Sequence, residues 1–164
     1  MLEDDVLKAL ITSCYTIGQL HSRMMLLRDF LNMTLFRSDT AFNPNLLTNE
    51  DKQFIDRLDK NLLAQFSNTN FGDTFKNLEA KIKAIKPLVI YTAVEIPEYE
   101  MALIGMYIRH NFRVDLVMDF KIDPSLIAGT ALSLNGVYKD YSARNGVESH
   151  KQEIIEQFKT FLGK

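Results

Sequence analysis

The stretch over residues 112–144 constrains the fold more than any other part of this chain. From Phe112 to Ile122, apolar residues alternate with mostly polar ones. A period of two places these two sets on opposite faces of a β-strand. Asp123-Pro124 should end that strand, because proline cannot donate a hydrogen bond to a sheet. The sequence therefore predicts a strand followed by a turn.

An Asn135-Gly136 pair follows this turn and predicts a tight β-hairpin. A type I′ turn needs positive φ at both central positions, and asparagine and glycine adopt positive φ most readily. We therefore expect two antiparallel strands around this pair. Nothing in this third of the chain has the pattern of a catalytic motif.

Composition sets the broad class of protein. A chain of 164 residues with 46% hydrophobic and 24% charged residues suits one domain or two small ones with a real core. A net charge of −2 argues against nucleic acid as a partner, since phosphate binding needs a basic surface. No run approaches the roughly 20 apolar residues of a membrane span. The acidic start and the single cysteine, Cys14, favour a cytoplasmic globular protein in a reducing compartment.

The first part of the chain is predicted to be helical. From Glu3 to Phe36, apolar residues recur at steps of three and four, which is typical of an amphipathic helix. One helix of this length would be about 50 Å long. We therefore expect a break at Gly18, between helices near Asp4–Ile17 and Gln19–Asn32. Residues 37–45 are expected to be irregular chain or one short turn.

Two more helices are expected before the β-rich part. Thr48 resembles the N-cap of a helix whose buried stripe runs over Phe54–Phe66. The next helix, about Asp73–Ile85, has apolar residues on one side and a Glu79/Lys83 pair on the other. With the first two, these make a small bundle of four or five helices.

The second half mixes strands and helices. Leu88–Val94 is short, β-branched and nearly all apolar, which is consistent with a strand covered on both faces. Pro97 suits the first position of a helix that ends near His110. Together with the strand over Phe112–Ile122, they predict a right-handed β-α-β unit. A final helix carries the apolar residues of Val147–Leu162.

These elements predict an α+β chain in two domains. The first is a helical bundle over residues 1–86, and the second is a β-α-β-hairpin-α domain over residues 87–164. No pattern asks for catalysis or a metal, since the three histidines lack ligand spacing. Ser125 and Ser142 read as local caps, and Cys14 as a small buried hydrophobe. We expect no catalytic residue, cofactor or metal ion.

The order of the C-terminal signals is similar to one known pattern. Asp123-Pro-Ser-Leu-Ile-Ala-Gly129, then a hairpin and Asp140-Tyr-Ser-Ala-Arg144, resembles the signature of the δ subunit of F-type ATP synthase and of its mitochondrial relative, the oligomycin-sensitivity-conferring protein. The family typically has DPSLIGG and then D-G-S-x-R, so Ala128 and Tyr141 replace two glycines. The Thr92–Pro97 segment is similar to the family's T-A-x-P-L. We expect the motif residues to be turn and cap positions of the fold and not a binding site: Asp123, Pro124, Ser125, Leu126, Ile127, Gly129, Asp140, Ser142 and Arg144.

The resemblance is looser in the first half. Leu7–Ile11 is similar to the family's YAKALF opening, and Asn43–Lys52 resembles the stretch before its fourth helix. The family's bundle usually has six helices, and this chain is short by about one after Leu63. The family's groove for the N-terminal helix of an α subunit is formed partly by its fifth helix. We therefore expect that groove to bind more weakly here.

The resemblance implies a non-catalytic stator subunit of the peripheral stalk, which supports proton-driven ATP synthesis. The helical domain would bind the α-subunit N-terminal helix at exposed apolar positions of its first helix. The C-terminal part would bind the C-terminal ends of the b subunits, without nucleic acid or direct membrane insertion. The protein would lie on the inner face of the plasma membrane or its organellar equivalent. Two alternatives stay open: a small α+β enzyme or ligand-binding domain, and an unrelated helical adaptor.

Overall fold

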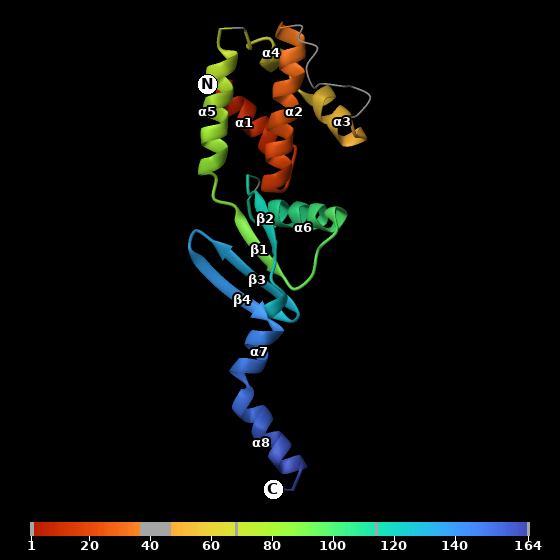
Figure 1. Cartoon of the computed structure of the whole chain (residues 1–164), viewed down its shortest axis with the longest axis vertical. Coiled ribbons are helices and arrows are strands. Elements are labelled where there is room, and N and C mark those ends of the chain that lie inside the picture. The colour runs from red at the N-terminus through yellow and green to blue at the C-terminus, as the bar shows by residue number, and fades with distance from the viewer. Residues whose placement is uncertain (1, 37–46, 68, 114, 164) are drawn as a thin grey trace.

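A computed structural model describes residues 2–36, 47–67, 69–113 and 115–163. The molecule is elongated, with a helical bundle at one end, a four-stranded sheet in the middle and two helices projecting beyond the sheet (Figure 1). This is the predicted α+β fold. The N-terminus lies in the bundle and the C-terminus at the far tip of the projecting helices (Figure 1).

The first two helices are α1 (Leu2–Thr12) and α2 (Ile17–Phe36). The predicted break at Gly18 is wrong, because the chain breaks just before it and Gly18 lies in the first turn of α2. Thr16 and Gln19 form a reciprocal cap at this point. Thr16 Oγ1 accepts from the Gln19 amide (3.2 Å), and Gln19 Oε1 accepts from the Thr16 amide (3.3 Å). Such a cap favours a helix start at this point, so α2 begins before Gly18 and continues through it.

The helix predicted after Thr48 is two helices, α3 (Asn49–Arg57) and α4 (Lys60–Leu63). Thr48 is confirmed as the N-cap of α3 and forms a capping box with Asp51. The single continuous helix is wrong, because Asp59 begins a new one by accepting a hydrogen bond from the backbone of α4. The irregular stretch predicted for residues 37–45 lies outside the described residues.

Helix α5 (Phe71–Ala84) completes the bundle, and its Glu79–Lys83 ion pair is confirmed at 2.9 Å. The described part of the bundle thus has five helices, within the predicted four or five. All five contribute to one cluster of buried side chains. The cluster consists of Val6, Leu10, Cys14, Leu20, Met24, Leu27, Leu31, Phe54, Leu58, Leu62, Phe66, Phe71, Phe75, Leu78, Ile82 and Val117.

The last member of that cluster, Val117, comes from the second half of the chain. It lies directly before a strand of the sheet and is 1% exposed. The division into domains over residues 1–86 and 87–164 therefore stays a prediction, with one side chain of the second range packed in the core of the first.

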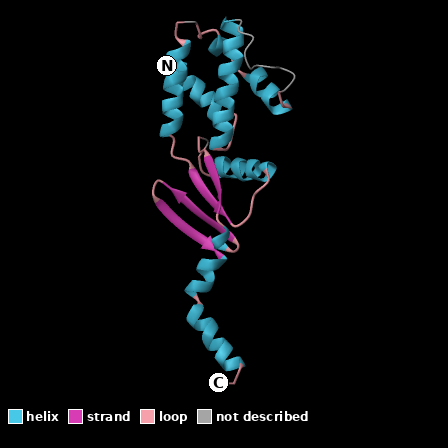
Figure 2. Cartoon of the chain, viewed as in Figure 1, coloured by secondary structure: helices cyan, strands magenta, loops and turns pink. Residues whose placement is uncertain are grey.

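The sheet has the strand order β2-β1-β3-β4 (Figure 2). Its strands are β1 (Leu88–Thr92), β2 (Met118–Ile122), β3 (Gly129–Leu134) and β4 (Val137–Ser142). β1 pairs in parallel with β2, β1 is antiparallel to β3, and β3 is antiparallel to β4. Helix α6 (Glu98–Asn111) connects β1 to β2, which confirms the β-α-β unit. Ile90 and Thr92 of β1 are buried and its other residues are half-buried, so both faces of the strand are at least partly covered, as predicted.

The hairpin between β3 and β4 is confirmed. Asn135 and Gly136 have φ of 51° and 82°, as a type I′ turn requires. The predicted start of the strand at Phe112 is wrong, because α6 extends to Asn111 and the Phe112 amide donates to Ile108 O (2.9 Å) to close the helix. β2 begins six residues later, at Met118.

The predicted final helix is two helices, α7 (Ala143–Ser149) and α8 (Lys151–Phe161), which meet at His150. We call them together the C-terminal arm. No residue of either helix is buried. Within the described residues, no helix has the length and the apolar character needed to cross a membrane.

Candidate functional site

The two halves of the signature meet at the end of the sheet from which the arm departs. Asp123 caps the short 3-10 helix Pro124–Leu126, and its Oδ1 accepts from the amide (3.0 Å) and the hydroxyl (2.6 Å) of Ser125. Arg144 then joins the two motifs, donating to Ser125 Oγ (2.8 Å) and to Asp140 Oδ2 (3.2 Å). Ser125 is therefore not itself the cap, and its hydroxyl bridges Asp123 to Arg144.

Asp140 and Ser142 set the start of α7. Asp140 Oδ1 accepts from the Ser142 amide (2.8 Å), and Ser142 Oγ accepts from the Asn145 amide (3.2 Å) as the N-cap. Asn145 Nδ2 returns a hydrogen bond to Asp140 O (3.1 Å). The hydrogen bonds from Ser142, and then Arg144, hold the pKa of Asp140 below its ordinary value. Asp140 is therefore ionised at neutral pH, and its charged hydrogen bond with Arg144 joins the end of β4 to the first turn of α7.

The middle of the first motif is a strained turn. Leu126 is fully buried, and Ile127 has a φ of 68° and a ψ of −56°. The Ala128 amide donates to Leu126 O (2.8 Å), which makes Ile127 the centre of a γ-turn of the rare positive-φ form. A β-branched residue is seldom found there. The turn leaves the Ile127 side chain 70% exposed beside the base of the arm.

The glycine after this turn is required by geometry. Gly129 has a φ of 81°, and a Cβ atom there would lie 2.6 Å from Tyr141 O. Neither Ala128 nor Tyr141 has positive φ. The two residues that replace glycines of the family pattern therefore stand where the backbone accepts a side chain.

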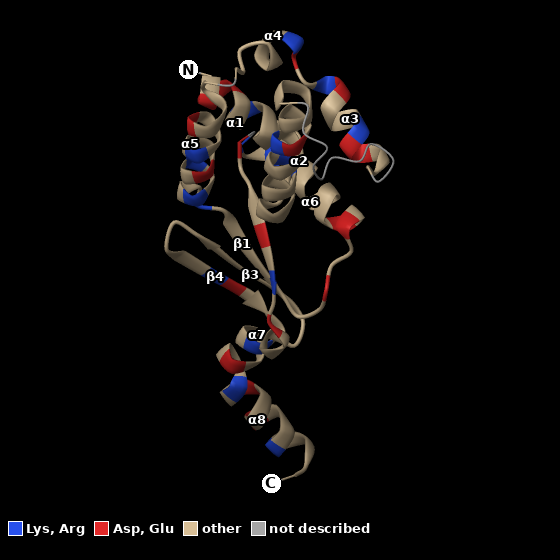
Figure 3. Ribbon diagram, turned by 45° about the horizontal axis from the view of Figure 1, so that its top comes forward, with Lys and Arg blue, Asp and Glu red and all other residues tan. Residues whose placement is uncertain are grey.

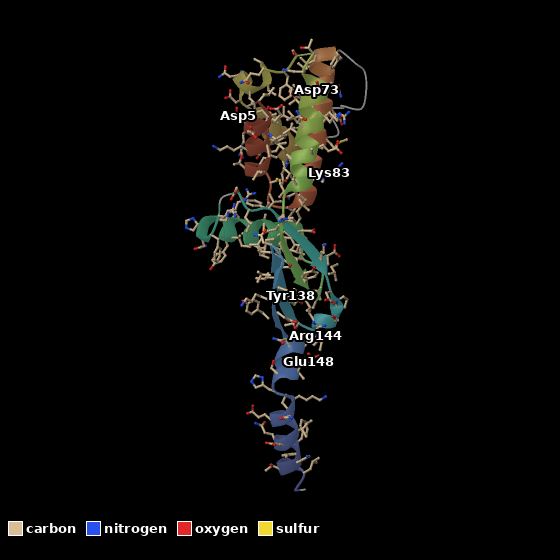
Figure 4. All side chains as sticks on the ribbon, turned by 90° about the vertical axis from the view of Figure 1, so that its left-hand side faces the viewer. Asp5, Asp73, Lys83, Tyr138, Arg144 and Glu148 are labelled. Atoms are coloured by element: carbon tan, nitrogen blue, oxygen red, sulfur yellow. The ribbon has the colours of Figure 1, made fainter. Side chains whose placement is uncertain are left out.

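The arm that leaves this network carries an uncovered apolar stripe. Figure 4 shows Arg144 and Glu148 on α7 near the sheet, and the side chains of α8 standing clear of the rest of the molecule. The apolar residues recur at helical spacing and are 37–86% exposed: Val147, Ile154, Ile155, Phe158, Phe161 and Leu162. An exposed apolar face of this kind marks a surface for another molecule. The arm is therefore the candidate functional site.

The charges of the arm do not favour one sign of partner. Lysine, arginine and acidic residues are interspersed along α7 and α8 (Figure 3): Arg144, Glu148, Lys151, Glu153, Glu156 and Lys159. The contact that this surface offers is therefore mainly apolar. The sequence places these residues on a helix, but periodicity alone does not tell a helix buried within the chain from one that awaits a partner.

A concave region lies between the bundle and α6. It is a cleft of about 690 Å³ between the end of α1, the starts of α2 and α6, and α3. Arg23 is ion-paired there with Asp51 and Glu50, and its guanidinium lies 5.2 Å from the centre of the Phe54 ring. These contacts join α2 to α3 within the bundle and leave the polar groups of that wall of the cleft paired with one another.

The exposed apolar positions expected on the first helix are not found there. In the described range of α1, Leu2, Leu7 and Ile11 are half-buried against the core of the bundle. The exposed large apolar side chains on the described helices of the bundle are Met25 (47%) and Phe36 (44%), both on α2. The prediction of exposed apolar positions on the first helix is therefore wrong.

Titratable and metal-ligating groups are scattered. Across the described residues, no three His, Cys, Asp or Glu side chains lie close enough to hold a metal ion. Cys14 is 2% exposed, and burial raises the pKa of its thiol to about 11. It is therefore a protonated, buried residue at neutral pH, which confirms its reading as a small hydrophobe.

Two curated proteins are similar to this chain, while no protein-family model matches it. ATP synthase subunit delta of Dichelobacter nodosus is 30% identical over 82 residues, which cover 50% of this chain and 45% of the relative. ATP synthase subunit delta of Pseudothermotoga lettingae is 25% identical over 83 residues, or 51% and 46%. The matched part of the chain spans about half the length of these relatives. Over about half its length, then, the chain is similar to delta subunits of ATP synthase.

Proposed function

We propose that this protein is a non-catalytic subunit of the peripheral stalk of an F-type ATP synthase. It connects the catalytic α/β head to the membrane-anchored b stalk and resists the torque of the rotor. The observation that carries the proposal is the C-terminal arm, which leaves the sheet with its apolar stripe uncovered. The similarity to two delta subunits supports the same assignment.

The arm is the proposed contact with the b subunits. An exposed helix with apolar residues at steps of three and four binds another helix by packing its side chains into the partner's grooves. Phe158 and Phe161 are the largest exposed side chains on α8, at 62% and 86%. Large aromatic residues dominate the affinity of such interfaces, so these two are the proposed anchors.

The base of the arm must hold its direction if the arm carries load. Arg144 bridges the two motifs, and Ser142 caps α7. On this proposal, the signature residues serve binding indirectly by setting the angle at which α7 leaves the sheet. They are positioning residues and do not themselves contact the b subunits.

The bundle is the proposed contact with the α subunit. The family groove is expected to be incomplete here, and the apolar side chains of α1 are already packed inward. We therefore expect the α-subunit helix to bind more weakly than the b ends. The proposal places the protein at the inner face of an energy-coupling membrane, bound there through the b subunits.

Binding to synthetic peptides tests this function directly. The chain is titrated with a C-terminal b peptide and with an N-terminal α peptide. Wild-type protein should bind the b peptide, and Phe158→Ala with Phe161→Ala should remove that binding. Phe112→Ala is the matched control, because Phe112 is 72% exposed but lies at the end of α6. If the wild type binds neither the b peptide nor the α peptide, the stator assignment is rejected. A gene placed between those of the b and α subunits would support it.

A further inference from the structure

The loop between α1 and α2 is joined to the sheet. The Met118 amide donates to Tyr15 O (2.9 Å), and Thr16 pairs with Met118 as an isolated parallel bridge. β2 is an edge strand, so this loop covers the start of an otherwise open edge. A backbone contact of this kind fixes the register between the bundle and the sheet.

Tyr15 also packs directly on the backbone of α6. A Cβ atom at Gly105 would lie 2.6 Å from Cγ and Cδ1 of Tyr15 and 2.7 Å from its Cβ. No side chain can occupy that space, so the tyrosine packs against the helix only because residue 105 is glycine. Glycine weakens the interior of a helix relative to alanine. At residue 105 the glycine allows Tyr15 to pack closely against α6.

Arg109, one turn further along α6, binds three segments of the chain at once. Its guanidinium lies 4.8 Å from the centre of the Tyr15 ring. Nη2 donates to Ile11 O at the end of α1 (2.8 Å), and Nε donates to Leu116 O before β2 (3.2 Å). The half-buried guanidinium therefore links the bundle, the loop and the segment that leads into the sheet.

Further contacts between the two halves lie on either side of Tyr15 and Arg109, one in the core and one at the surface. Val117 is buried in the core of the bundle, and the next residue, Met118, is fully buried as the first residue of β2. At the rim, Gln19 Nε2 donates to Glu98 Oε1 at the start of α6 (3.0 Å). Contacts to both halves therefore run from the solvent edge to the core.

We propose that this junction, formed by Tyr15, Thr16, Gly105, Arg109 and Val117, holds the bundle and the sheet at one fixed angle. The bundle and the sheet then unfold together and move as one body. Along the chain, only the short segment between α5 and β1 connects the end of the bundle to the start of the sheet. The inference goes beyond the proposed stator function. Its tests use the protein alone, without α or b peptides, so it stands or falls independently of the partners.

Urea unfolding with residue-level hydrogen exchange tests the junction first. In the wild type, amides of the bundle core and of β1 should lose protection in a single transition. In Gly105→Ala, the added methyl group displaces Tyr15, so the Met118 amide should lose protection and the two halves should unfold separately. Gly146→Ala is the matched control, since a Cβ there meets no atom within 4 Å. Separate transitions in the wild type, or a single one in Gly105→Ala, would overturn the proposal.

Distances between the halves provide a second test that survives if Gly105→Ala does not fold. Spin labels are attached at Lys76→Cys on α5 and Lys139→Cys on β4, both exposed positions. Cys14 is buried and stays unlabelled. The wild-type junction should give one narrow distance distribution, and Tyr15→Ala should broaden it. A broad wild-type distribution, or no broadening in Tyr15→Ala, would show that the junction does not set the angle.

Discussion

Helices α5 and α8 have similar sequences in pattern but opposite environments. Both carry apolar residues at helical spacing with charged residues between them. α5 buries Phe71, Thr74, Phe75, Leu78 and Ile82, whereas α8 buries none of its residues. The difference is that other helices of the same chain cover α5, and nothing in the described chain covers α8 (Figure 1). An amphipathic pattern therefore predicts that one face of a helix is covered. It does not predict whether the covering residues belong to the same chain or to another molecule.

The largest expected effect is on the stability of the bundle. Leu78 in α5 is fully buried, so Leu78→Ala should lower the free energy of unfolding by about 2–5 kcal/mol through lost burial and a residual cavity. Leu162→Ala, at the exposed end of the arm, should change it by no more than about 0.5 kcal/mol. Urea denaturation measures both. Equal losses in the two variants would mean that the arm is covered in solution.

For partner binding, substitutions in the arm should have larger effects than substitutions in the bundle core. Phe158→Ala and Phe161→Ala should each weaken binding of a b peptide by about 2 kcal/mol, or roughly thirtyfold in Kd, because exposed aromatic residues become interface anchors. Neither should alter the urea midpoint. Calorimetric titration gives the affinity, and Leu78→Ala, measured where it remains folded, should bind normally. Normal binding by both phenylalanine variants would move the partner surface off α8.

The two helical regions should also differ in their need for a cap. Asn70 makes no side-chain cap at the start of α5, whereas Ser142 caps α7. Ser142→Ala should therefore cost about 1 kcal/mol of local stability and expose the Asn145 amide to exchange. Ser149→Ala is the control, because that hydroxyl only donates to Asn145 O within α7. An unchanged exchange rate at Asn145 would show that the arm does not depend on its cap.

The smallest effect concerns acid. Hydrogen bonds from Ser125 and Ser142 hold the pKa values of Asp123 and Asp140 below their ordinary value of 3.8. Their contribution to stability is therefore present above pH 3.8 and is lost as the pH falls through the lower folded values. Amide exchange in α7 should rise over that acid range. In Asp140→Asn the acid-induced rise in the amide exchange rate of α7 should be smaller. A rise of the same size as in the wild type would mean that groups other than Asp140 cause it.

Local chemistry made part of this fold predictable. The Thr48 cap and the Asn135-Gly136 turn involve residues within a few positions of one another, and both are confirmed. The break before α2 also had a local signal, the T-x-x-Q spacing of Thr16 and Gln19. That signal is stronger than Gly18, because a capping box creates a helix start while an isolated glycine only weakens a helix.

Other features depend on tertiary contacts and had no local signal. Phe112 continues an alternating pattern, yet it closes α6 because the helix extends to Asn111. Val117 stands among the residues assigned to the polar face of a strand, yet it is packed in the bundle. The arm was predicted as a helix, but its exposure depends on what the rest of the chain leaves uncovered. Period and capping cannot supply that information.

The position of Val117 in the bundle core has a consequence for the order of events on the ribosome. A nascent chain gains residues at about 5–20 per second, and its N-terminal part generally begins to fold first. Here the last bundle helix ends at Ala84, and the side chain that completes its interior follows only at residue 117. The buried cluster therefore gains this member only after β1 and α6 have also emerged.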